Sequence, residues 1–214
     1  MTAHFQWSSE FLPLPERAIE QFRRQWHLLA EPGTWWSGPE RVAIADASRA
    51  AQRGELPAPS PDRSDFVGTV AAKVGAAASD VTETDVASFE QEGLNPLAFI
   101  ELVGVVARTA AIDTALRGLG APIEPLPVPA PGSPSNELGI GAKRRSAWVA
   151  TVGAAGPASA LSAVPAENRA QSDLHGALYL SYDEMSDLDI HKGLARFQLE
   201  LVAARTSLLN DCFF

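Results

Sequence analysis

The chain has 214 residues, which is enough for one large domain or two smaller lobes. Hydrophobic residues make up 46% of it and charged residues 20%, so a sizeable core can form and wholesale disorder is disfavoured. The formal net charge of −9, without a basic stripe of interleaved aromatics, disfavours nucleic-acid binding.

The N-terminal segment Met1–Glu10 lacks the basic region and apolar stretch of a secretory signal. No window approaches the ~20 apolar residues that cross a bilayer. Cys212 is the single cysteine, which rules out an intrachain disulfide framework. We therefore expect a cytoplasmic protein that does not contact a membrane.

Helical periodicity and helix-end signals run through the first 120 residues. In the first predicted helix Ile19, Phe22 and Trp26 follow helical spacing, and Ser37 and Ser64 are candidate N-caps for later helices. The predicted helices cover residues 16–31, 38–53, 64–78, 82–89 and 96–119.

A change in composition follows. Residues 121–136 hold six prolines and are predicted to form an extended linker, because proline removes backbone donors and disfavours helix. An irregular region is expected to about residue 180, with 148–152 as coil or a short strand. One helical turn at 183–188 and a helix over 194–210 complete the chain. The prediction is an all-α protein with a helical lobe (1–120), a linker (121–136) and the start of a second lobe (137–214).

Two stretches resemble the alkylhydroperoxidase D-like and carboxymuconolactone decarboxylase-like family. The first runs from the acidic helix start at 81–86 through Gly93-Leu94 to a long helix opening with Phe99-Ile100-Glu101-Leu102. It is similar to the closing half of a domain of that family. Residues 40–53 resemble the family's lead-in helix in degenerate form, but the first lobe contains no cysteine.

The second stretch, residues 198–212, resembles the helix that leads into the family's Cys-x-x-Cys motif. In that family a proton-relay Glu lies twelve residues before the first Cys, and Glu200 and Cys212 have this spacing, since 212 − 200 = 12. The resemblance implies that Cys212 is a redox residue and Glu200 its proton relay. The required chemistry is a thiolate that attacks a peroxide bond and a partner that resolves the sulfenic acid.

The motif is incomplete within 214 residues. Its second position would be 215, and the family's following His is also missing. One branch of the family consists of alkylhydroperoxidase-related selenoproteins, so we expect that the sequence is cut at a UGA codon recoded as selenocysteine. A truncated sequence, or one deliberately ended at this residue, would stop at the same place. Peroxidase turnover by the 214-residue chain is not expected.

The other polar candidates favour structural roles. Glu101 lies in an apolar helix and is expected to be a satisfied structural carboxylate. The histidines His4, His27, His175 and His191 lack metal-ligand spacing, so we expect neither a metal nor a cofactor. Four tryptophans are predicted to anchor the core or a lobe interface: Trp26, Trp35, Trp36 and Trp148.

Two functional hypotheses remain. The first is a thiol- or selenol-dependent peroxidase that acts on a hydroperoxide-type small molecule in its full-length form and, as the resemblance implies, assembles into homo-oligomers. The second is a non-enzymatic helical scaffold or interaction protein that has lost the active site.

Overall fold

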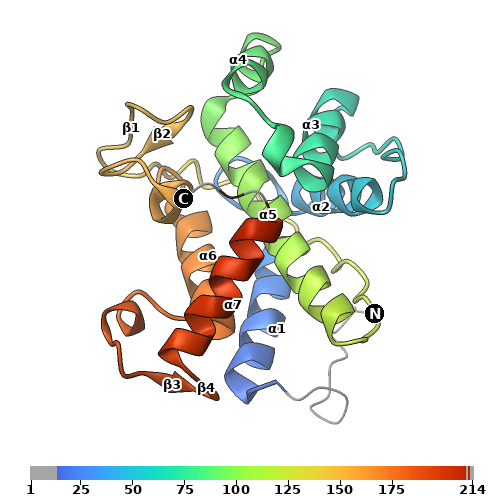
Figure 1. Cartoon of the computed structure of the whole chain (residues 1–214). Coiled ribbons are helices and arrows are strands. Elements are labelled where there is room, and N and C mark those ends of the chain that lie inside the picture. The colour runs from blue at the N-terminus through green and yellow to red at the C-terminus, as the bar shows by residue number, and fades with distance from the viewer. Residues whose placement is uncertain (1–13, 211, 213–214) are drawn as a thin grey trace.

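The computed structural model describes residues 14–210 and 212, and it is all-α as predicted (Figure 1). The expectation for Met1–Glu10 lies outside the described residues. The helices are α1 (Glu16–Ala30), α2 (Gly38–Gln52), α3 (Asp65–Ala76), α4 (Glu83–Gln91), α5 (Pro96–Gly118), α6 (Pro165–Leu178) and α7 (Arg196–Leu209).

The remaining elements are small. Three 3-10 turns are η1 (Ala78–Asp80), η2 (Pro157–Ser159) and η3 (Glu184–Ser186). Two antiparallel pairs of two-residue strands join β1 (Lys143–Arg144) to β2 (Ala150–Thr151) and β3 (His191–Lys192) to β4 (Leu194–Ala195). Helices therefore form the core, and the strands only fasten loops.

Side-chain caps explain where several helices begin. Ser64 accepts a hydrogen bond from the Val67 amide at the start of α3. At the start of α4, Thr82 and Asp85 cap each other's backbone in a capping box. Asn95 accepts from the Leu97 amide ahead of α5. These local bonds satisfy amides that a helix leaves free in its first turn, so the starts of these helices are readable from sequence.

Helix α5 runs through the middle of the molecule and packs against α1, α2, α3 and α6 (Figure 1). The core lies around it and consists of residues that are almost completely inaccessible to solvent, among them Ile19, Phe22, Leu29, Ile44, Val70, Leu102 and Leu116. Trp26 belongs to this core, and Trp35 and Trp36 pack against it, whereas Trp148 is 43% exposed.

The proline-rich segment 121–136 is extended, and it is fastened along the helical body. The Trp26 indole N–H donates to the Pro125 carbonyl over 2.9 Å, and Arg49 donates to the Glu124 carbonyl over 2.9 Å. Backbone bonds from residues 130, 135 and 136 then reach residues 30, 33 and 34. The segment therefore acts as a strap that carries the chain back across the first helices.

Helix α6 is the main correction to the sequence-based prediction, which expected irregular structure up to about residue 180. It begins at Pro165, a favourable first helical residue. It packs on α1 and α5, and Leu174 is part of the same core as the first helices. Few of its residues are large and apolar, and for that reason the periodicity of the sequence did not reveal it. No helix within residues 14–210 is long and apolar enough to cross a membrane.

Candidate functional site

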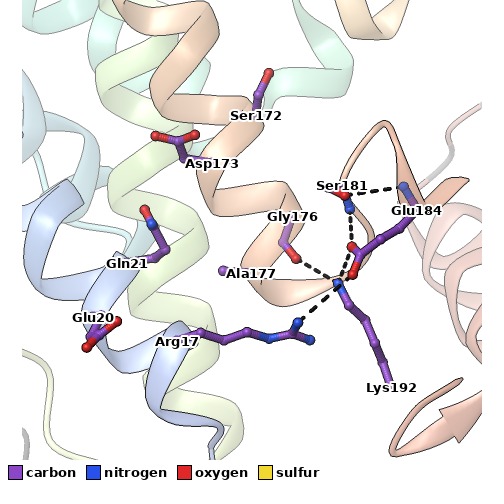
Figure 2. A pocket seen from close by; sticks show the side chains of 10 residues that line it. All are labelled: Arg17, Glu20, Gln21, Ser172, Asp173, Gly176, Ala177, Ser181, Glu184 and Lys192. Carbon is purple, nitrogen blue, oxygen red and sulfur yellow. Dashed lines mark hydrogen bonds and ion pairs between the residues drawn. The ribbon is translucent and has the colours of Figure 1, made fainter. Parts of the chain in front are cut away.

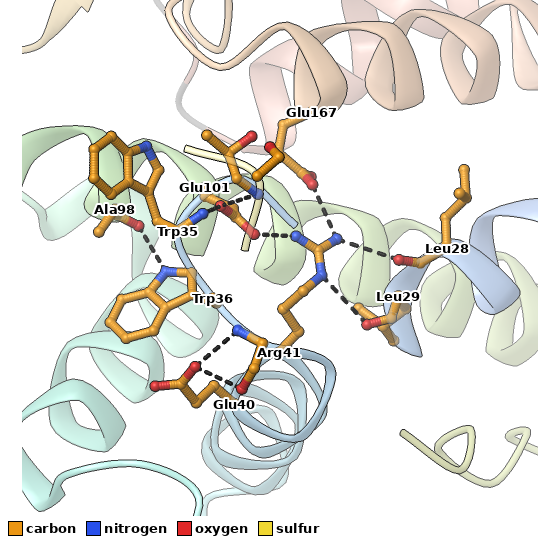
Figure 3. Close-up of polar contacts among 12 residues, drawn as sticks. Leu28, Leu29, Trp35, Trp36, Glu40, Arg41, Ala98, Glu101 and Glu167 are labelled. Carbon is orange, nitrogen blue, oxygen red and sulfur yellow. Dashed lines mark hydrogen bonds and ion pairs between the residues drawn. The ribbon is translucent and has the colours of Figure 1, made fainter. Parts of the chain in front are cut away.

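A cluster of buried charges joins three helices at the centre of the molecule (Figure 3). Arg41 of α2 forms ion pairs with Glu101 of α5 and with Glu167 of α6, the latter over 2.9 Å. Arg108 of α5 reaches the other oxygen of Glu167 over 2.6 Å. All four side chains are at most 3% exposed. The cluster therefore links segments up to 126 residues apart along the sequence.

The loop between α1 and α2 supplies the remaining contacts of Glu101, whereas Arg108 Nη1 is buried without a hydrogen-bond partner among the described residues. The amides of Thr34 and Trp35 donate to one oxygen of Glu101 over 3.0 and 2.6 Å, while its other oxygen faces Arg41. Arg41 also donates to the carbonyls of Leu28 and Leu29, near the end of α1. Glu101 is thus the satisfied structural carboxylate predicted from sequence, with every partner inside the protein.

The environment shifts the pKa of each carboxyl differently. Burial raises the pKa of Glu101, which faces a single guanidinium. Burial acts in the same direction on Glu167, but Arg108 and Arg41 outweigh it and lower the pKa of that carboxyl. Burial also lowers the pKa of Arg108. Glu167, held between two guanidinium groups, is therefore more firmly ionised than Glu101.

Two glycines leave space for the buried carboxylates of this cluster. A Cβ on Gly33 would lie 1.8 Å from Glu101 Oε1, and a Cβ on Gly104 would lie 2.5 Å from Glu167 Oε2. Both positions therefore require the close approach that only glycine allows without displacing a buried charge. The cluster is fully enclosed and packed, which fits an architectural role better than a substrate site.

A second buried ion pair holds the proline-rich segment 121–136 against the helices. Arg49 of α2 pairs with Asp113 of α5 through two bonds of 2.8 and 2.7 Å, and its guanidinium lies 5.3 Å from the centre of the Trp26 ring. Sequence reasoning missed Arg41 and Arg49 as buried residues. The available signal was their position on the face of α2 that also carries Ile44 and Ser48, which are buried.

The predicted redox residues lie on and just after α7. Glu200 sits in the first half of the helix, where its Oε1 accepts from the Tyr179 hydroxyl and from Arg196 Nε, both over 2.6 Å. The hydrogen bond from Tyr179, helped by Arg196, lowers the pKa of Glu200. Glu200 is therefore an anchored, ionised carboxylate.

Cys212 is exposed and follows the end of α7. Its amide donates to the Ser207 carbonyl over 3.0 Å, and its sulfur lies 3.8 Å from the Asn210 carbonyl oxygen. Since a helix rises 1.5 Å per residue, Glu200 is separated from Ser207 by about 10 Å along the axis. The structure therefore does not bring Glu200 and Cys212 into contact, and the relay between them stays a prediction.

The histidines within the described residues occupy separate places. His27 pairs with Glu31 at 3.1 Å on the surface of α1. His175 contacts the Leu180 carbonyl over 2.8 Å and packs against the rings of Tyr179 and Tyr182. Among residues 14–210 and 212, no three His, Cys, Asp or Glu side chains come together to hold a metal ion.

An open pocket of about 330 Å³ lies between α1 and the segment from α6 to β3 (Figure 2). Most of its charged side chains form ion pairs with one another or donate hydrogen bonds to backbone carbonyls. Lys192 donates to Glu184 and to the carbonyls of Gly176 and Tyr179, each carbonyl at 3.0 Å, and Arg17 lies 4.0 Å from Glu184. Gln21 Oε1, which is buried and has no hydrogen-bond partner, is the exception among these lining residues. One such group does not make the converging set of polar groups expected of a binding site.

Comparison of the chain with models of protein families, with curated proteins and with solved structures finds no match. Any functional assignment must therefore be argued from the residues themselves.

We predict that Arg41→Met destabilises the protein by roughly 3–5 kcal/mol, because it leaves buried Glu101 without its guanidinium and Glu167 with only one. Unfolding in urea, followed by circular dichroism, measures the loss. Arg53→Met is the matched control: its pair with Glu55 is exposed and screened by solvent, so its removal should leave the urea midpoint almost unchanged. Equal losses for the two variants would contradict the architectural role of the cluster.

A second prediction concerns pH and the segment that holds α7. The ion pair with Lys192, assisted by the Ser181 amide, lowers the pKa of Glu184 from 4.5 to about 2. A carboxyl whose pKa is lower in the folded state than in the unfolded state stabilises the folded protein when the pH is above its unfolded-state pKa. This stabilisation is lost as the pH falls through the folded-state pKa. The contribution of Glu184 to the free energy of unfolding should therefore be complete above about pH 5 and decline between about pH 4.5 and pH 2.

The test is an NMR titration of the Glu184 carboxyl. In Lys192→Met its pKa should rise toward the ordinary value, and the acid-dependent loss of stability should shrink. Lys143→Met removes another lysine without affecting Glu184 and should leave its titration unchanged. An unshifted Glu184 titration in Lys192→Met would contradict the assignment.

Proposed function

We propose that the chain is an alkylhydroperoxidase-related redox protein in which Cys212 is one member of a thiol or selenol pair and Glu200 supplies the proton relay. The second member would stand three residues after Cys212 in a full-length form. The 214-residue chain, with its single thiol, would not turn over as a peroxidase. A cytoplasmic location, where such a thiol stays reduced, belongs to this proposal.

The observation that supports it is an ionised carboxylate on α7 and, just after the end of that helix, an exposed thiol. Glu200 accepts a hydrogen bond from Tyr179, so it has a proton donor beside it. Cys212 stands twelve residues later and is open to solvent, as a residue that meets a hydroperoxide must be.

The chemistry would run in two balanced steps. The thiolate of Cys212 attacks the terminal oxygen of a hydroperoxide, which breaks the O–O bond and releases an alcohol after protonation, leaving a sulfenic acid. A neighbouring thiol or selenol then displaces water to form a disulfide or selenenyl sulfide, and a thiol donor returns the two electrons. In the 214-residue form, Cys212 follows a helix C-terminus and has no cation among the described contacts of its sulfur, so an activating partner is needed.

A second candidate function, a non-enzymatic helical interaction protein, is favoured by a different observation. Helix α7 has no buried residue, and it turns large apolar side chains such as Phe197 and Leu201 to solvent. Exposed apolar patches of this kind mark interaction surfaces.

We predict that the protein purified from its native source, grown with selenium, has an intact mass well above 22.7 kDa. Selenium should appear in the peptide that spans position 215. The measurement is intact-protein mass spectrometry followed by peptide mapping, and the same culture without selenium is the control.

A native mass of 22.7 kDa with Phe214 as the last residue would overturn the redox proposal and leave the interaction function. A longer protein that carries cysteine in place of selenocysteine at position 215 would keep the redox proposal but remove the selenium.

A further inference from the structure

The side-chain amide of Gln25 is a buried polar group that no other part of the described chain binds. Gln25 lies in α1 and is 0% exposed, yet neither its Oε1 nor its Nε2 has a hydrogen-bond partner among the described residues. Nearly all buried polar groups in proteins are hydrogen-bonded, either to the protein or to ordered water, because an unpaired one costs free energy. The amide therefore needs a partner that the described chain does not supply.

Gln25 lies between the open pocket and the cluster of buried charges. Gln21, one turn earlier on α1, lines the pocket, and its Oε1 is buried and also unpartnered (Figure 2). One turn after Gln25, the Leu28 carbonyl accepts a hydrogen bond from Arg41 of the cluster. Since residues three and four apart share a face of a helix, these positions form a row about 10 Å long that leads from the pocket to the cluster.

Helix α6 packs along this row and runs antiparallel to α1. Arg24 of α1 pairs with Asp173 over 3.4 Å, whereas Arg41, which binds the last turn of α1, pairs with the earlier Glu167 over 2.9 Å. Gln25 therefore lies level with the part of α6 between Glu167 and Asp173, on the pocket side of the cluster.

The third unpartnered group belongs to α5. Arg108 is 3% exposed, and its Nη2 donates to Glu167 over 2.6 Å, whereas its Nη1 is buried and has no partner among residues 14–210 and 212. Arg108 and Gln25 therefore approach the same stretch of α6, one from α5 and the other from α1. From the pocket inward, the unpartnered atoms are an acceptor on Gln21, an acceptor and a donor on Gln25, and a donor on Arg108.

We propose that internal water molecules bind between α1, α5 and α6, at the Gln25 amide and at Arg108 Nη1, and continue to Gln21 at the pocket. Water both donates and accepts, so it satisfies all of these atoms, and enclosed polar sites are where proteins bind it. A bound ion is disfavoured, because the two guanidinium groups of the cluster are already balanced by two carboxylates. The buried cluster thereby exchanges protons with the solvent of the pocket without unfolding. This inference is independent of the redox chemistry of Cys212.

Nuclear magnetic resonance of the intact, isotope-labelled chain tests the proposal. The side-chain N–H protons of Gln25 and Arg108 should both show cross-peaks with water. These peaks should have opposite signs in laboratory-frame and rotating-frame experiments, which is the signature of water held in place rather than of proton exchange or passing surface water. The absence of such peaks at both side chains would overturn the proposal.

Gln25→Leu, which has a similar volume, is the variant that tests the same site by stability. It should weaken the cross-peak between Arg108 and water and lower the folding equilibrium constant about tenfold, because the bound water and Arg108 Nη1 lose a partner. Gln91→Leu removes the same amide from an exposed position at the end of α4 and should change neither quantity. The wild-type spectrum decides the proposal even if Gln25→Leu does not fold.

Two further results would contradict the water site. A Gln25→Leu variant more stable than the wild type would show that the amide is unpaired in the folded protein. An Arg108 signal that moves with chloride at constant ionic strength, without a water cross-peak, would assign the site to an anion instead.

Discussion

The fold depends on one buried guanidinium. Arg41 lies between the end of α1, the first third of α5 and the start of α6, and it binds Glu101, Glu167 and two backbone carbonyls. Removing such a charge from water is costly and is offset only when every partner is in place. The short loop at Thr34 and Trp35, the glycines at 33 and 104 and the position of α6 are all arranged around this requirement.

The Arg41 cluster distinguishes two parts of the described chain. The first is a body whose helices share the ionic cluster or the apolar core, and the second is α7, which shares neither. Helix α6 shares both the ionic cluster and the apolar core, through Glu167 and Leu174, so it belongs mechanically with α1 and α5. Helix α7 has neither kind of contact and is held at its base by Arg196 and Glu200. The residues that carry the proposed chemistry therefore lie on α7 or just after its end, where the described chain makes few tertiary contacts.

Much of this organisation was predictable from sequence, because helix ends carry local signals. The predicted starts and ends of α1–α5 and α7 lie within about two residues of the structure, with Ser64, Thr82 and Asn95 acting as caps.

Helix α6 was missed because Ala170 and Leu174 are nearly its only buried apolar residues, and its place is set by the distant Arg41 and Arg108. Glu200 and Cys212 were proposed as site residues from the spacing of the family that they resemble, and this role stays a prediction. Spacing contains no information about Tyr179 or Arg196, which hold Glu200. The division into two lobes with a linker stays a prediction.

The central claim, that α6 is locked into the body while α7 is held only at its base, is tested most directly by hydrogen exchange of the intact chain followed by mass spectrometry. In dilute solution we expect the amides of α6 to exchange as slowly as those of α5 and the amides of residues 201–209 to exchange far faster. Rapid exchange of α6, at the rate of α7, would contradict the account.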